Sequence, residues 1–270
     1  MLTRIISGAI CAIGAILIVV SGDAFMSAAV GIIVLMSLFE FFGATGVKNN
    51  SKFLFCLSVV FGAVLTFLTA YFKKLSYFNE MLVLYIVISF IYMVLNHGKV
   101  KFGDVALSVL GSLYITLFFN HIIMIRHLSH GMLYIWLPFV TAWLCDTCAY
   151  FTGMLFGKHK LIPKVSPKKT IEGAIGGVLG SVISVVIFAL VCAKVANAQV
   201  SFVNAIILGA VCAVISQFGD LCASCIKREH DVKDFGNLIP GHGGILDRFD
   251  SVLMVSPIVY YLSLYMGIIG

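Results

Sequence analysis

Long apolar runs separated by short polar clusters extend along this chain from one end to the other. A helix of about 20 apolar residues can span a membrane, because it satisfies its own backbone hydrogen bonds. The runs predict nine spanning helices, at 5–21, 24–42, 53–72, 80–95, 104–124, 131–156, 171–193, 202–225 and 249–268. The first run also suits a signal peptide, but the segment 21–24 lacks a small-residue cleavage site, so we keep it as an uncleaved helix.

The composition agrees with an all-α polytopic membrane protein and excludes an ordinary soluble one. Hydrophobic residues make up 61% of the chain and charged residues 11%, whereas a soluble domain has about 25% charged residues. Nine helices and their connections leave no room for a separate soluble domain. We therefore expect a mainly structural N-terminal part of about five helices, 1–130, and a catalytic C-terminal part of about four helices, 131–270.

The basic residues are distributed unevenly between the two sides that these helices define. Of the 18 Lys and Arg residues, all except Lys73, Lys74, Arg126 and Lys194 fall on the side of the N-terminus. Basic residues near helix ends stay in the cytoplasm. The pattern predicts a cytoplasmic N-terminus and an external C-terminus.

Two cysteine pairs, Cys145/Cys148 and Cys222/Cys225, have the spacing of zinc ligands. Both pairs lie inside apolar segments at helical i, i+3 spacing, whereas structural zinc sites mostly present such pairs on turns. The alternative, which we favour, is that these cysteines are small packing residues.

Chemically active residue types concentrate after residue 140. Asp146 lies inside the sixth predicted helix, one turn before Tyr150. A lone carboxylate there costs about 2.5 to 3.5 kcal/mol on insertion scales, so it should face protein or water. A structural hydrogen bond to Tyr150 and a functional role are both open.

A lysine-rich segment at 157–170 precedes the seventh predicted helix. Ser166 is its predicted N-cap and Pro167 its first helical residue. Free amides at a helix start, with Lys168, Lys169 and Thr170 beside them, favour a phosphate site, although such a cluster also suits simple binding of anionic lipid headgroups. Small residues follow at helical spacing and predict close helix packing, namely Gly173, Gly176, Gly177 and Gly180.

The richest cluster runs from the eighth predicted helix into the ninth. Asp220, Ser224 and Lys227 are spaced i, i+4, i+7 and so share one helix face. Asp247 and Asp250 follow a glycine-rich turn. Carboxylates beside basic residues suit Mg²⁺ bridging phosphate oxygens, and the alternative is a buried network of salt bridges.

These residues carry a resemblance to a known family. Ser224-x-Ile226-Lys227-Arg228, Lys233-Asp234-x-Gly236 and Ile239-Pro240-x-His242-Gly243-Gly244-Ile245-x-Asp247-Arg248-Phe249-Asp250 resemble the signature of phosphatidate cytidylyltransferases, also called CDP-diacylglycerol synthases. Ser166-Pro167-Lys168-Lys169-Thr170-x-Glu172-Gly173 is similar to another stretch of that family. The signature occupies residues 224–250, about a tenth of the chain.

The resemblance implies transfer of the cytidylyl group of CTP to phosphatidate, with Mg²⁺ held by Asp220 and Asp247. The catalytic residues that it implies are Asp220, Asp247, Lys168, Lys169, Lys227, Arg228 and Asp250. The substrate-binding residues that it implies are Ser166, Thr170, Glu172, Ser224, Lys233, Asp234, His242, Gly243, Gly244, Arg248 and Asp146. No residue is assigned to cytosine.

The expected setting is a bacterial inner (cell) membrane, with the active site on the cytoplasmic side. We expect membrane lipids and no nucleic acid among the partners, and a homodimer through the small-residue helix faces. Two rival functions are open. A coupled transporter should show an inverted repeat or paired broken helices, and we find neither; an enzyme acting on polyprenyl phosphates would use the same metal and phosphate chemistry.

Overall fold

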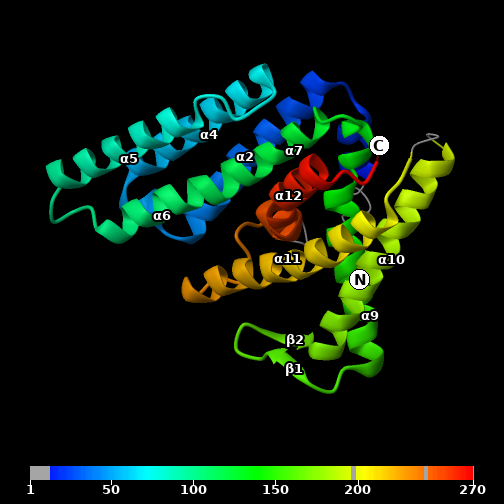
Figure 1. The fold of residues 1–270 in the computed structure, drawn as a ribbon. Coiled ribbons are helices and arrows are strands. Elements are labelled where there is room, and N and C mark those ends of the chain that lie inside the picture. Colours follow the sequence, from blue (N-terminus) through cyan, green and yellow to red (C-terminus); the bar gives the residue numbers. More distant parts are fainter. Residues whose placement is uncertain (1–12, 196–198, 240–242, 270) are drawn as a thin grey trace. The chain divides into compact units, whose positions relative to one another are not determined.

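The computed structural model describes residues 13–195, 199–239 and 243–269, and this part of the chain is almost entirely helical (Figure 1). The elements are α2 (Asp23–Ala44), α3 (Val47–Asn50), α4 (Lys52–Phe72), α5 (Phe78–Leu95), α6 (Phe102–Ser112), the π-helical turn η1 (Leu113–Leu117), α7 (Phe118–Arg126), α8 (Gly131–Tyr134), α9 (Leu137–Phe156), β1 (Lys160–Ile162), β2 (Ser166–Thr170), α10 (Ile171–Val195), α11 (Phe202–Glu229) and α12 (Leu246–Met266).

Eight described helical stretches are long and apolar enough to cross a membrane, which confirms an all-α polytopic membrane protein. They coincide with the last eight of the nine predicted helices. The first predicted helix, 5–21, lies partly outside the described residues, and its part at 13–20 is helical. Two spans are composite: one joins α6, η1 and α7, and the other joins α8 and α9.

The chain forms two compact units. The first contains residues 1–124 and 230–248, and the second contains 125–229 and 249–270. The loop before α12 therefore belongs to the same unit as the N-terminal helices, although it is far from them in sequence. The division of labour that we expect between 1–130 and 131–270 stays a prediction.

In the first unit, α4 packs against α2, α5 and α6. A buried hydroxyl cluster joins three of these helices. The Tyr85 hydroxyl lies 2.8 Å from that of Ser58, 2.7 Å from that of Ser108 and 3.0 Å from that of Ser112. Hydroxyls that satisfy one another remove the cost of burying polar groups in an apolar helix layer. The cluster therefore explains why these polar residues occur inside spanning helices.

In the second unit, α9, α10 and α11 pack against one another, and the small residues of α10 form the contact with α9. An added Cβ at Gly176 would collide with Thr152, one at Gly177 would lie 3.1 Å from the sulfur of Cys145, and one at Gly180 would collide with Cys148. The predicted close packing is confirmed.

The contact between α9 and α10 bears on two further predictions, one about the cysteine pairs and one about the homodimer. Cys145 and Cys148 are packing residues on α9, whereas Cys222 and Cys225 on α11 are exposed, so the packing role that we favour is not confirmed for the second pair. Among the described residues no three His, Cys, Asp or Glu side chains are placed to hold a metal ion. The glycine face of α10 is covered by α9 within the chain. The structure describes one chain, and the homodimer stays a prediction.

Candidate active site

The lysine-rich segment between α9 and α10 is a β-hairpin, so the predicted N-cap at Ser166 is wrong. Ser166–Thr170 forms β2, which pairs antiparallel with β1, and α10 begins only at Ile171. The pairing satisfies backbone groups that our prediction gave to a helix, and Pro167 sits in a two-stranded sheet in which both strands are edges, where proline is tolerated.

Thr170 takes the capping position instead. Its buried hydroxyl oxygen Oγ1 accepts a hydrogen bond from the backbone N–H of Gly173, at 3.1 Å. Threonine at this position satisfies one of the free amides at a helix start. The capping chemistry that we expected therefore exists, four residues later in the chain.

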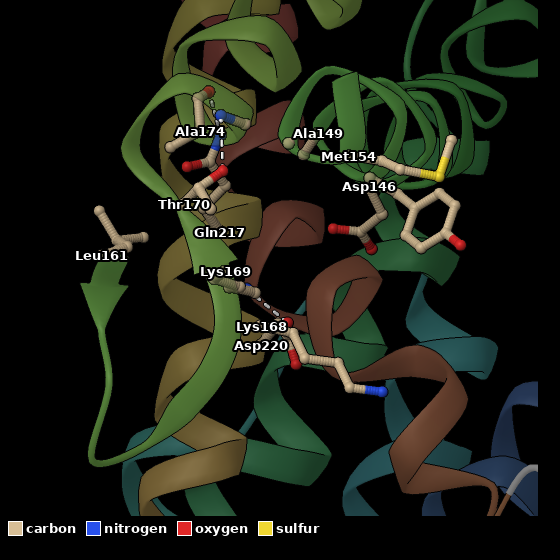
Figure 2. Close-up of a pocket in the computed structure, with 13 residues that line it drawn as sticks. Asp146, Ala149, Met154, Leu161, Lys168, Lys169, Thr170, Ala174, Gln217 and Asp220 are labelled. Atoms are coloured by element: carbon tan, nitrogen blue, oxygen red, sulfur yellow. Dashed lines mark hydrogen bonds and ion pairs between the residues drawn. The ribbon is translucent and has the colours of Figure 1, made fainter. Parts of the chain in front are cut away.

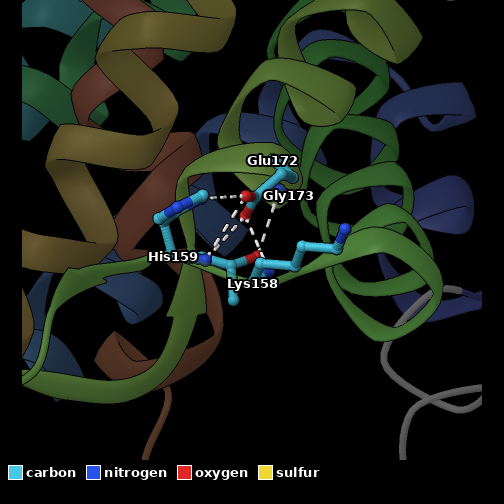
Figure 3. Close-up of polar contacts among 5 residues, drawn as sticks. Lys158, His159, Glu172 and Gly173 are labelled. Carbon is cyan, nitrogen blue, oxygen red and sulfur yellow. Dashed lines mark hydrogen bonds and ion pairs between the residues drawn. The ribbon is translucent and has the colours of Figure 1, made fainter.

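Glu172 fastens the beginning of the hairpin to α10. Figure 3 shows its carboxylate facing the backbone of Lys158 and His159. The N–H groups of these two residues donate to Oε2 at 3.1 and 3.2 Å, and His159 Nδ1 lies 2.6 Å from Oε1. These contacts favour a role for Glu172 in holding the hairpin rather than in touching substrate.

A pocket of about 320 Å³ lies between the hairpin and helices α9, α10 and α11 (Figure 2). Its polar lining includes five residues that the sequence singled out, Asp146, Lys168, Lys169, Thr170 and Asp220. The remaining lining is largely apolar and is contributed by Ala149, Tyr150, Gly153, Met154, Leu161, Gly173, Ala174 and Gln217. The pocket thus offers charge and apolar surface to one ligand.

The strongest polar contact in this pocket is an ion pair between β2 and α11. Lys169 Nζ lies 2.5 Å from Asp220 Oδ2, and both side chains are largely shielded from solvent, at 25% and 31% exposed. Figure 2 shows this pair, with Asp146 and Lys168 facing the same pocket. The participation of Asp146 in the lining favours the functional reading of this carboxylate.

Asp250, on α12, adds a third carboxylate to this region. It is buried, and its charge interacts with those of Asp220, Asp146 and Lys227. Lys227 is itself buried, two turns after Asp220 on the same face of α11. The hydroxyl of Ser251 reaches Asp146 Oδ2 at 3.5 Å. Three carboxylates and two lysines therefore gather within the second unit.

The donor set allows a test of whether Mg²⁺ fits here. Three mutually repelling carboxylates favour a bound cation, but among the described residues no three acidic, His or Cys side chains form a ready ligand set. Mg²⁺ usually keeps several waters and takes only one or two carboxylates together with substrate phosphates. The residues therefore fit an ion that is held jointly by protein and nucleotide.

We call residues 230–245, between α11 and α12, the signature loop. The side chain of Asp247 holds this loop. Asp247 is buried, and its Oδ2 accepts hydrogen bonds from the N–H groups of Phe235 at 2.8 Å and Gly244 at 2.9 Å. Gly243 adopts φ +82°, a conformation that favours glycine. The Asp247 carboxylate thereby links the two ends of the loop, at Phe235 and at Gly244.

Most of the other predicted site residues are more exposed to solvent. Lys168, Arg228, Lys233, Asp234 and Arg248 are exposed, whereas Ser166 and Ser224 are partly buried. His242 lies outside the described residues. Asp247 belongs to the first unit and Asp220 to the second, so the shared metal site that we expect for this pair stays a prediction.

Sequence reasoning missed two residues near the predicted chemistry. Gln217 lines the pocket and donates from Nε2 to the Ala174 carbonyl at 2.9 Å. Its position one turn before Asp220 is a signal that could have identified it. Glu40 accepts hydrogen bonds from two backbone N–H groups at the end of the signature loop, and no motif in the sequence marks this residue.

The chain is similar to known proteins over most of its length. The model of the cytidylyltransferase family matches residues 2–266. A phosphatidate cytidylyltransferase of Bacillus subtilis is 37% identical over 172 residues, which are 63% of this chain and 62% of the relative. Proteins of the same name from Staphylococcus saprophyticus and Staphylococcus haemolyticus are 34% and 35% identical, over 63% and 65% of this chain and 64% and 65% of the relatives. The match thus spans a little under two thirds of each relative.

Proposed function

This chain belongs to the cytidylyltransferase family, and from that premise we propose that it transfers the cytidylyl group of CTP to phosphatidate, giving CDP-diacylglycerol and pyrophosphate. The observation that carries the proposal is the pocket in which Lys169 of the hairpin pairs with Asp220 of α11. The relatives named phosphatidate cytidylyltransferase support this pair of substrates.

In the proposed reaction, a phosphate oxygen of phosphatidate attacks the α-phosphorus of CTP. One P–O bond forms there, the bond from that phosphorus to the bridging oxygen breaks, and pyrophosphate leaves. A phosphate monoester has a second pKa of about 6, so the phosphate group of phosphatidate is already largely ionised at neutral pH. Catalysis then requires two anions to be aligned and neutralised rather than a strong general base.

The pocket suits this task because cations and apolar surface lie together. Lys168 and Lys169 would bind phosphate oxygens, and Lys169 would share its charge between the substrate and Asp220. Met154 and Leu161 line the same pocket and would contact the apolar part of a lipid. A charged site with an apolar wall fits an amphipathic phosphate better than a soluble one.

We include Mg²⁺ in the proposal. Asp220 and Asp250 would hold it in the second unit, and Asp247 remains a predicted ligand. When bound, such an ion neutralises charge on the phosphoryl oxygens of the nucleotide. Lys227, buried near Asp250, limits the repulsion between the carboxylates.

We also propose that the pocket opens on the cytoplasmic side of a bacterial inner membrane. Of the ten lysines and arginines after residue 135, five lie in the segment 157–170, and four more lie in or beside the loop between α11 and α12, namely Lys227, Arg228, Lys233 and Arg248. Basic loops stay in the cytoplasm, where CTP is made. The spanning helices and the bacterial relatives support this setting.

The proposal is tested with purified protein in mixed micelles, supplied with CTP labelled at the α-phosphate, phosphatidate and Mg²⁺. We expect label in the lipid phase and an equal amount of pyrophosphate, both abolished by omitting Mg²⁺ and by Asp220→Asn. Glu80→Gln, which changes an exposed carboxylate at the start of α5, is the matched control and should retain activity. Labelled product formed only from a polyprenyl phosphate would overturn the proposed acceptor.

A further inference from the structure

An acidic residue of the second helix holds the start of the last one. The Glu40 carboxylate, on α2, accepts hydrogen bonds from the backbone N–H groups of Ile245 and Leu246, each at 2.9 Å and each through a different oxygen. These amides stand at the start of α12, where N–H groups have no partner within the helix. Glu40 therefore fills a site that would otherwise attract an external anion.

Glu40 and Asp247 together fix both ends of the signature loop. Asp247 binds the amides of Phe235 and Gly244, and Glu40 binds the next two amides of the chain. The ring of Phe41, the neighbour of Glu40 on α2, lies 6.0 Å from that of Phe235. The loop is thus anchored to α2 by two carboxylate hydrogen bonds and an aromatic contact.

Two glycines of the loop owe their identity to this carboxylate. A Cβ added at Gly236 would lie 2.6 Å from Glu40 Oε1, and one added at Gly244 would collide with the same carboxylate group. Neither glycine has a positive φ. Glycine is therefore required at both positions by the close approach of Glu40, not by backbone conformation.

We propose that Glu40 is a positioning residue for the reaction: it sets the place of the loop that carries Asp247, Lys233 and Asp234. This inference rests on the proposed function and extends it to a residue of the N-terminal helices. The hydrogen bonds of the Glu40 carboxylate go to backbone N–H groups of Ile245 and Leu246, so Glu40 acts through the backbone of the loop.

The proposal predicts separate effects on turnover for the charge and for the length of the Glu40 side chain. Glutamine has the length of glutamate but only one accepting oxygen, and its NH₂ group would face an N–H donor. Aspartate keeps both oxygens but is one methylene shorter. We expect Glu40→Gln to lower turnover about 10- to 100-fold, the loss usual for partners that orient a ligand residue, and Glu40→Asp to recover part of it.

The experiment compares Glu40→Gln, Glu40→Asp and the matched control Glu80→Gln in the CTP-dependent assay, and follows amide hydrogen exchange of the same proteins in detergent. In Glu40→Gln the peptide that contains Ile245 and Leu246 should exchange about tenfold faster, since a hydrogen bond to a charged acceptor is lost. Peptides of α4 should exchange as in the wild type.

The outcomes separate this inference from the proposed function. A wild type that makes no CDP-lipid, with faster exchange in Glu40→Gln, overturns the function but keeps the anchoring of the loop. An active wild type whose Glu40→Gln variant matches Glu80→Gln in both turnover and exchange overturns the inference. If Glu40→Asp and Glu40→Gln have equal activity, Glu40 has only a structural role and the proposed positioning role is wrong.

A second pair of variants covers the case in which Glu40→Gln does not accumulate. Gly236→Ala should lose activity alone, because its methyl group displaces the Glu40 carboxylate. In a Glu40→Ala background there is no carboxylate to displace, so adding Gly236→Ala should cost little further. Independent, additive losses of the two substitutions would contradict the proposed contact.

Discussion

At the scale of single residues, the pocket depends on a lysine with a dual role. Lys169 is paired with Asp220, yet it also lines the pocket that we assign to a phosphate. In an environment largely shielded from solvent, its charge acts more strongly than that of an exposed lysine. The neighbouring lysines of the hairpin lack this shielding, as the exposed Lys164 shows.

This contrast gives a direct test. Lys169→Ala should reduce kcat/KM for the CTP and phosphatidate reaction by about tenfold or more, because a charge-assisted contact to the anion disappears. Lys164→Ala, in the same hairpin, is the matched control and should stay near wild type. The check is initial-rate kinetics at equal amounts of folded protein. If the two variants are equally active, the segment only binds lipid headgroups.

Some of these residues were accessible from sequence and others were not. Asp220 stood out because carboxylates are rare inside spanning helices, and Lys169 stood out because the motif around it is specific. Glu40 did not stand out, because its partners are backbone amides about 200 residues later. A contact with backbone leaves no pattern of side-chain types in the sequence, so no spacing rule could have revealed it.

At the scale of elements, apolar length predicted the helices well, whereas local capping signals misled. The spans were found because lipid requires an uninterrupted apolar helix. Ser166 and Pro167 have the residue types of a helix start, but pairing with β1 placed them in a strand and moved the cap to Thr170. Pairing between strands depends on the residues of the partner strand and of the turn, and residue types at one position do not report it.

The contact between α9 and α10 leads to a prediction at this scale. Gly180→Ala should lower the stability of the protein in detergent by about 1 to 3 kcal/mol, because its methyl group collides with Cys148. The combination with Cys148→Gly should restore part of the loss, since it removes both the Sγ and the Cβ that the new methyl group meets. Thermal unfolding measured in one detergent checks both expectations.

Gly103→Ala is a suitable control, because nothing lies within 4 Å of a Cβ added there. It should be neutral or slightly stabilising in a helix. Loss of wild-type stability on adding a zinc chelator, or no interaction between Gly180 and Cys148 in the double variant, would contradict a packing role for this cysteine.

At the scale of the whole molecule, the order of the spans fixes the relative sides of two segments. Between the hairpin and the C-terminal end lie α10, α11 and α12, each long and apolar enough to cross a membrane. We expect each of the three to cross once, and three crossings would put the two segments on opposite sides. This conclusion does not depend on the first predicted helix, which lies partly outside the described residues.

Reporter fusions test this arrangement in cells. A reporter inserted within 158–164 should be cytoplasmic, as the lysines of the hairpin require, and one fused after residue 270 should be external. Enzymatic reporters that are active on one side only provide the measurement, with a fusion in the short α4–α5 connection as the control for the outer side. Both fusions on the same side would reject the topology.

The hairpin between α9 and α10 also bears on how the pocket is assembled during synthesis. The ribosome completes α9, the hairpin and α10 before it makes α11, and the tight glycine contact lets these two helices associate as soon as both are inserted. Lys169 is thus in place before its counter-charge Asp220 exists. A chain released after α10 would therefore carry Lys169 without this partner and without the α11 wall of the pocket, formed by Gln217 and Asp220.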